Sequence, residues 1–242
     1  MNNLLLFELR KIFTQISFYV CTLALIIYQI IVSVLNMHNI SAVLETTPTV
    51  VDLLSTSGTY CNLSLFCSVI IAILICNDFS VGTLHDLVGR GYTRLQYFIS
   101  KFVMTIGITL LYLIIGIITG FLTGIVYLDI GNTFNELFSV ICTQYLLALA
   151  YTSFAFMISL ISGKVFISII IGSLFPFIER LIVFLWDSLF GEITIHIKQY
   201  SLSSIEILPL NNGISQQFTI ICSIYIAVFL IIAFLFFRWK EI

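Results

Sequence analysis

Few side chains in this 242-residue sequence have the types and spacing of a catalytic or metal-binding site. An intramembrane protease would need a GxSG motif with a histidine, paired catalytic aspartates or HExxH, and none of these is present. The six cysteines form no CxxC pair and fall almost entirely within apolar runs, where cysteine behaves as a small hydrophobic residue. We therefore expect neither a catalytic residue nor a metal site in this chain.

A phosphate-binding loop is also missing from the sequence. Gly163-Lys164 is the sole Gly-Lys pair, and it lacks both the upstream glycine and the following Ser or Thr of such a loop. We expect no cofactor bound by this chain and no enzyme activity of its own.

The composition is that of an integral membrane protein. Hydrophobic residues make up 60% of the chain and charged residues 9%, and the mean hydropathy is +1.14. Soluble proteins carry about 25% charged residues. One span needs roughly 20 apolar residues. We predict an all-α, polytopic fold with one transmembrane domain over 1–242 and six spans, at 16–35, 59–75, 102–128, 137–161, 165–180 and 218–237.

The distribution of positive charge predicts the orientation. Cytoplasmic loops retain Lys and Arg. Of the ten such residues, two fall on the side away from the termini, Arg180 and Lys198. The other eight fall on the side of the termini: Arg10, Lys11, Arg90, Arg94, Lys101, Lys164, Arg238 and Lys240. We expect both termini to be cytoplasmic.

The fifth apolar segment is interrupted by Glu179 and Arg180, shortly after Pro176. Charges at mid-membrane are costly, so we favour a helix that ends near residue 178 or 180 and is followed by a re-entrant segment in the outer leaflet. The alternative is one helix to Trp186, kinked after Pro176, with the two charged residues facing a bundle interior.

The first fifteen residues predict an amphipathic helix. On a helical wheel, an apolar stripe lies opposite a polar face that includes Glu8, Arg10 and Lys11. A helix of this kind before a span should lie in the cytoplasmic headgroup layer. The alternative is the frayed start of the first span.

Residues 78–91 interrupt the apolar sequence with polar residues and glycines. Asp78 and Ser80 are N-cap types, and an apolar edge follows at helical spacing, so we predict a short cytoplasmic helix that ends at Gly89 and Gly91. Thr93 and Gln96 form a capping-box pattern that opens the next helix. An apolar edge ringed by polar groups is typical of a docking surface, although lipid headgroups accept the same kind of segment.

This stretch resembles the cytoplasmic loop between the first helix pair of ABC-type export permeases of the six-helix, ABCG-like kind. The order is an acidic residue, Gly-Thr, apolar residues, Gly, a small residue, Arg, an aromatic residue and Lys. The positions that carry it are Asp78, Gly82, Thr83, Leu84, Leu87, Gly91, Thr93, Arg94, Tyr97 and Lys101. One departure is Asp78, where Glu is more usual.

The resemblance implies that 78–91 is a coupling helix that sits in a groove of a separate ABC ATPase subunit, which binds ATP and Mg. The coupling residues would be Asp78, Gly82, Thr83, Leu84, Leu87, Val88, Arg90, Gly91 and Arg94. It further implies a second permease chain, a bacterial cytoplasmic membrane and no nucleic-acid partner. The cargo would be hydrophobic or amphipathic, such as an antimicrobial peptide or drug exported for self-immunity.

The resemblance implies a dimer contact through the second and fifth segments, so their polar residues are candidates for the dimer interface or the translocation path. These are Asn62, Ser64, Ser68, Ser168, Ser173, Glu179 and Arg180. Three glycines four residues apart, Gly116, Gly120 and Gly124, favour close packing within the chain over a dimer seam. A secondary transporter, or a structural or assembly subunit, remains an alternative to the exporter.

Overall fold

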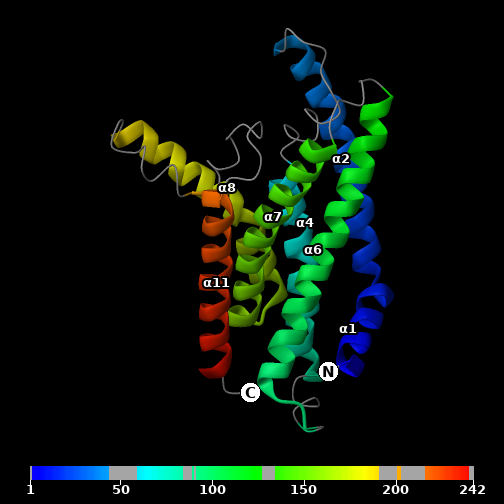
Figure 1. Cartoon of the computed structure of the whole chain (residues 1–242). Coiled ribbons are helices and arrows are strands. Elements are labelled where there is room, and N and C mark those ends of the chain that lie inside the picture. Colours follow the sequence, from blue (N-terminus) through cyan, green and yellow to red (C-terminus); the bar gives the residue numbers. More distant parts are fainter. Residues whose placement is uncertain are drawn as a thin grey trace.

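The computed structural model describes residues 2–43, 59–83, 89, 91–126, 134–190, 201–202 and 216–239. In these ranges the regular elements of the chain are helices, which run side by side in one bundle (Figure 1). Their bounds are α1 (Asn2–Thr14), α2 (Ile16–Val43), α4 (Thr59–Val81), α6 (Arg94–Ile125), α7 (Phe134–Ser162), α8 (Val165–Phe190) and α11 (Gln216–Trp239). The start of α1 and the end of α11 lie at the same end of the bundle, as an even number of spans requires (Figure 1).

Six of these helices are long and apolar enough to cross a membrane, and they carry the six predicted spans. The helices extend further than the apolar runs that predicted them. Helix α4 continues to Val81 instead of residue 75, and α6 begins at Arg94 instead of residue 102. A helix does not have to end where its hydrophobicity ends, because each backbone hydrogen bond stays within the helix.

The core of the bundle is formed by α4 and α7, which pack against each other and against α8. In one 18-residue apolar stretch of each helix, 56% of the residues of α4 and 67% of those of α7 are buried, compared with 17% in α8 and in α11. The peripheral helices expose large apolar residues such as Ile171, Ile224 and Leu235. Lipid tails are as apolar as leucine, so such faces need no protein cover within a bilayer.

Glycines on α6 allow close packing within the chain, as predicted. Gly116, Gly120 and Gly124 are all buried. A Cβ added to Gly116 would lie 3.6 Å from a side-chain carbon of Leu63 on α4. The first position of this stripe therefore packs α6 against α4.

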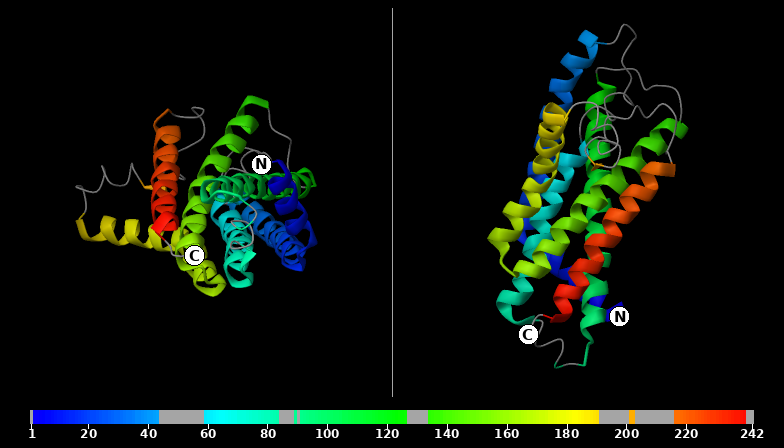
Figure 2. Two further views of the ribbon diagram at one scale, coloured as in Figure 1. Left: turned by 90° about the horizontal axis from the view of Figure 1, so that it is seen from below. Right: turned by 90° about the vertical axis from the view of Figure 1, so that its left-hand side faces the viewer.

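The favoured prediction for the fifth segment is wrong. Helix α8 does not end near residue 178 or 180 but continues to Phe190, with Pro176 in its interior. Figures 1 and 2 show its second half turning away from the bundle. Proline lacks a backbone N–H and its ring crowds the carbonyl four residues earlier, which bends a helix without ending it. Residues 181–190 therefore belong to α8 and not to a separate re-entrant element.

Candidate functional site

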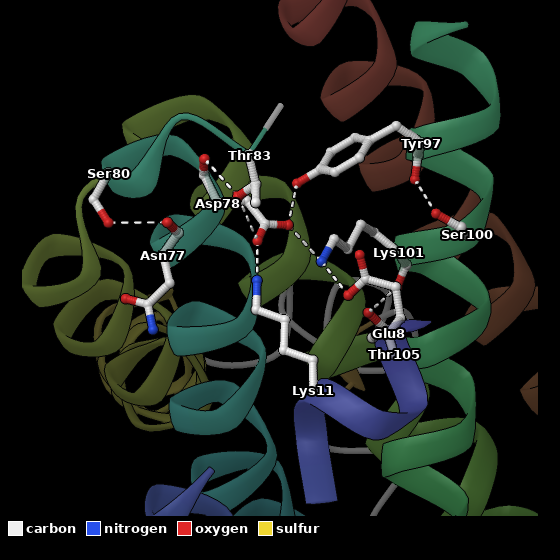
Figure 3. A network of polar contacts seen from close by, with 10 residues as sticks. All are labelled: Glu8, Lys11, Asn77, Asp78, Ser80, Thr83, Tyr97, Ser100, Lys101 and Thr105. Carbon is white, nitrogen blue, oxygen red and sulfur yellow. Dashed lines mark hydrogen bonds and ion pairs between the residues drawn. The ribbon is translucent and has the colours of Figure 1, made fainter. Parts of the chain in front are cut away.

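A network of buried ion pairs joins α1, α4 and α6 at the end of the bundle where both termini lie (Figures 1 and 3). We call it the ion network; it consists of Glu8, Lys11, Asp78, Tyr97 and Lys101. Lys101 Nζ lies 2.5 Å from Glu8 Oε2 and 2.5 Å from Asp78 Oδ2. Lys11 Nζ donates to Asp78 Oδ1, and the Tyr97 hydroxyl donates to Asp78 Oδ2 over 3.0 Å.

Helical spacing brings these side chains together. Glu8 and Lys11 are three residues apart on α1, and Tyr97 and Lys101 are four apart on α6. Residues at these separations lie on one face of a helix. Asp78 extends from the last turn of α4 between the two faces (Figure 3). The carboxylate of Asp78 is thus the point at which the three helices meet.

The ion network is buried apart from Lys11, and its charges are balanced. Lys101 is fully buried, and Glu8 and Asp78 are each 1% exposed. Two carboxylates face two ammonium groups, so the formal charges cancel. Buried charges are tolerated in proteins when they are paired and hydrogen-bonded. Lys101 gains a further contact from the Tyr97 ring, whose centroid lies 5.4 Å from Nζ.

Part of the polar face of α1 faces the bundle, because Glu8 and Lys11 both pair with residues of other helices. Glu8 and Ile12 are buried against the bundle, whereas the apolar residues Leu6 and Phe13 are 61% and 47% exposed. The reason is that Lys101 and Asp78 supply partners for the charged side chains of α1. The helix itself, predicted over 1–15, spans Asn2–Thr14 and is separated from α2 at Gln15.

Both ends of the segment between α4 and α6 have defined backbone geometry. Helix α4 stops at Gly82, which has a φ of 75° that favours glycine. Thr93 begins α6 with a complete capping box: its Oγ1 accepts from Gln96 N at 3.3 Å, and its own N–H donates to Gln96 Oε1 at 3.0 Å. The predicted capping box is confirmed.

The predicted start of the coupling helix at Asp78 is wrong. Residues 78–81 are the last turn of α4, and Ser80 Oγ donates back to the Asn77 carbonyl at 3.0 Å. The Asp78 side chain pairs with lysines instead of capping a new helix. Thr83 Oγ1 donates to Asp78 Oδ1 and to the Asp78 carbonyl, each at 3.2 Å, and so holds the first residues after α4.

Of the predicted coupling residues, the structure describes Asp78, Gly82, Thr83, Gly91 and Arg94. The others, Leu84, Leu87, Val88 and Arg90, lie outside the described residues. Asp78 is buried in the ion network, and Thr83 contacts it. Arg94 is exposed at the start of α6, where its Nη1 donates to the Arg238 carbonyl at 3.3 Å.

Aromatic rings attach the first two turns of α6 to α11 and α7. Tyr97 stacks on Phe237 with ring centroids 5.7 Å apart and an interplanar angle of 21°. Phe98 meets Phe234 and Phe156 edge-on, each with centroids 5.4 Å apart. The first two turns of α6 thus contact both the ion network and an aromatic cluster.

The serines proposed for the dimer interface or the path lie away from the ion network. Ser64, Ser68 and Ser168 are buried inside the chain, where α4, α7 and α8 pack together. Ser168 Oγ lies 2.6 Å from Ser162 Oγ and 3.3 Å from Cys76 Sγ. Ser173 Oγ donates to the Ile170 carbonyl at 3.3 Å. The side chain of Asn62 lies outside the described residues.

Glu179 and Arg180, the remaining candidates for the path, lie on α8. Glu179 Oε1 accepts a hydrogen bond from the Leu202 backbone N–H at 2.7 Å, and Arg180 is exposed on α8. In the described part of the chain no cluster of three or more His, Cys, Asp or Glu side chains could hold a metal ion.

Glu8, Lys11, Tyr97 and Lys101 were not recognised from the sequence as one site. A signal was present: Lys101 is an isolated charge in a long apolar helix, and ionisable residues in such helices normally have a buried partner. Which partner it has depends on the packing of α1, which the sequence leaves open.

Comparison with known proteins gives one family assignment. A search among curated proteins found no match. A family model described as "Protein of unknown function (DUF2705)" matches residues 25–242. The matched range contains Asp78, Tyr97 and Lys101 and begins after α1. Because the model matches most of the chain, this protein belongs to the DUF2705 family.

Proposed function

We propose that this chain is the membrane-spanning subunit of an ATP-driven exporter, powered by a separate ABC ATPase subunit. The observation that carries the proposal is the position of the ion network. Asp78 lies at the end of α4 and Tyr97 and Lys101 near the start of α6, so the network ties both ends of the segment 82–93 to each other and to α1. A segment fixed at both ends can pass an applied force to the helices on either side.

In this proposal the segment 82–93 contacts the ATPase on the cytoplasmic side of a bacterial membrane. Closure of the ATPase subunits displaces the segment, and α4 and α6 tilt because the ion pairs hold them together. The resemblance to ABCG-like permeases, carried by residues from Asp78 to Lys101, supports this arrangement and a pore built from two permease chains.

The substrate that fits best is hydrophobic or amphipathic, such as an antimicrobial peptide. Transport of a hydrated ion requires polar groups that line the path. Many hydroxyls in the spans instead donate to carbonyls of their own helix, among them Thr119, Thr123 and Thr143, at 2.9 to 3.0 Å. The chain would then serve export or self-protection against such a peptide.

The decisive experiment combines co-purification with transport. We expect the chain to recover an ATPase subunit from its host membrane, and replacement of both Leu84 and Leu87 by Asp to abolish ATP-driven export while membrane insertion persists. The matched control replaces Leu185 and Leu189, which are exposed on α8 at the opposite end of the bundle, by Asp. Unchanged export in the Leu84/Leu87 variant would remove the coupling role.

A secondary transporter is the second candidate, and the buried ionisable groups of the ion network favour it. Ion-coupled carriers use such groups to bind the coupling ion. Vesicles that lack ATP but carry a proton or sodium gradient distinguish the two candidates. Gradient-driven flux without ATP would favour the secondary transporter, and absence of flux without ATP would favour the exporter.

A further inference from the structure

Tyr97 belongs to two groups of contacts at once. Its hydroxyl donates to Asp78 Oδ2 at 3.0 Å, and its ring stacks on Phe237 of α11. The side chain is 2% exposed and Phe237 is 1% exposed, so both contacts are enclosed by protein. Through a single ring, the last turn of α4 is connected to the last turn of α11.

This connection leaves Asp78 and the last turn of α11 little freedom to move independently of each other. A tyrosine side chain has two rotatable bonds, and close packing leaves few voids into which a buried ring could move. A shift of Asp78 must therefore either break the hydrogen bond or press the ring against Phe237. The last turn of α11 is held to α6 by a second contact one residue further on, between Arg94 Nη1 and the Arg238 carbonyl.

We propose that Tyr97 is a positioning residue that transmits displacement of Asp78, at the end of α4, to the C-terminal turn of α11. The Tyr97 hydroxyl contacts Asp78 of the ion network, and its ring contacts Phe237 of α11, which packs against α7. For its role in transport this inference rests on the proposed function. Movement of the segment 82–93 would then reach α11 through one hydroxyl and one ring.

The connection can be tested without an ATPase, because Trp239 follows Phe237 by two residues and is exposed. The chain has two tryptophans, so Trp186→Phe leaves Trp239 as the single reporter. In the purified full chain we expect Asp78→Asn to change the emission and iodide quenching of Trp239. In a Tyr97→Phe background this response should be lost, because the hydroxyl that senses Asp78 is gone.

Tyr112→Phe is the matched control background. Tyr112 is buried on the same helix, but its hydroxyl donates to the Phe18 carbonyl of α2 at 3.4 Å and not to Asp78. The response to Asp78→Asn should persist there. A response of equal size in the Tyr97→Phe background overturns the proposal, and so does the absence of any Trp239 response. Should Asp78→Asn fail to fold, Lys11→Gln perturbs the same carboxylate from a side chain that is 22% exposed.

A second measurement addresses transport. In proteoliposomes that contain the complex with its ATPase, Tyr97→Phe should retain ATP hydrolysis, while the amount of substrate moved per ATP falls by about tenfold, the equivalent of one hydrogen bond to a charged group. Tyr112→Phe should keep the ratio of the parent. An unchanged ratio in Tyr97→Phe counts against the proposal. If no ATPase associates with the parent chain, the proposed function fails, and the Trp239 measurement alone decides the role of Tyr97.

Discussion

Replacement of Lys101 by Met should destabilise the protein strongly, because it removes the cation that two buried carboxylates share. Lys101 Nζ lies 2.5 Å from both Glu8 Oε2 and Asp78 Oδ2, and its side chain is fully buried. Methionine approximates the volume of the lysine stem, so the change removes charge with little loss of packing. Of the ion network's charged groups, Glu8, Asp78 and Lys11 remain, with a formal net charge of −1.

The expected magnitude follows from burial. Removal of one partner of a buried ion pair costs about 3 to 5 kcal/mol, since the remaining charge is neither paired nor hydrated. A loss of this size raises the ratio of unfolded to folded protein by about two to four orders of magnitude. It should also change little with ionic strength, because salt screens buried pairs weakly.

The assay is equilibrium unfolding in detergent, followed by far-UV circular dichroism. Lys164→Met is the matched control, because Lys164 is exposed in the turn between α7 and α8, and it should change the free energy of unfolding by less than about 0.5 kcal/mol. Combining Glu8→Gln with Lys101→Met restores neutrality and should recover part of the loss. Equal unfolding free energies for Lys101→Met and Lys164→Met would refute the argument, as would a double variant less stable than Lys101→Met alone.

Two further predictions use the same unfolding assay. Gly172→Ala should lower stability by about 1 to 3 kcal/mol, because the added Cβ would lie 3.1 Å from Ala155 Cβ and 3.4 Å from its Cα. Gly107→Ala should instead raise stability by about 0.5 to 1 kcal/mol, because its added Cβ would meet nothing within 4 Å. Stability changes of the same sign in the two variants would contradict this prediction. Thr93→Ala should lower the free energy of unfolding by about 1 kcal/mol, because the capping box is lost. An unchanged unfolding midpoint would contradict a stabilising role for this capping box.

Local features of the sequence predicted most of the secondary structure. The six spans follow from runs of apolar residues whose length matches the thickness of a bilayer. The capping box at Thr93 could be recognised because its two hydrogen bonds involve residues three positions apart. The glycine pattern at Gly116, Gly120 and Gly124 likewise predicted close packing within the chain, although not that α4 is the partner helix.

Two predictions that rested on residue type alone were wrong. The charges at Glu179 and Arg180 suggested a helix end, but α8 continues beyond them and turns away from the bundle. Asp78 has the residue type of an N-cap, yet it lies inside the last turn of α4 because lysines from α1 and α6 bind its carboxylate. In both cases the residue type is compatible with more than one structure.

The sequence by itself determined that the chain is all-helical, with six helices long and apolar enough to span a membrane, because hydropathy and helical hydrogen bonding act over a few residues. Only the tertiary structure decided that Glu8, Lys11, Asp78 and Lys101 form one buried network. The paired residues are 67 and 93 positions apart for Lys11 with Asp78 and for Glu8 with Lys101. Which face of α1 turns inward depends on where α4 and α6 place their charges, and this becomes fixed only when the helices pack together.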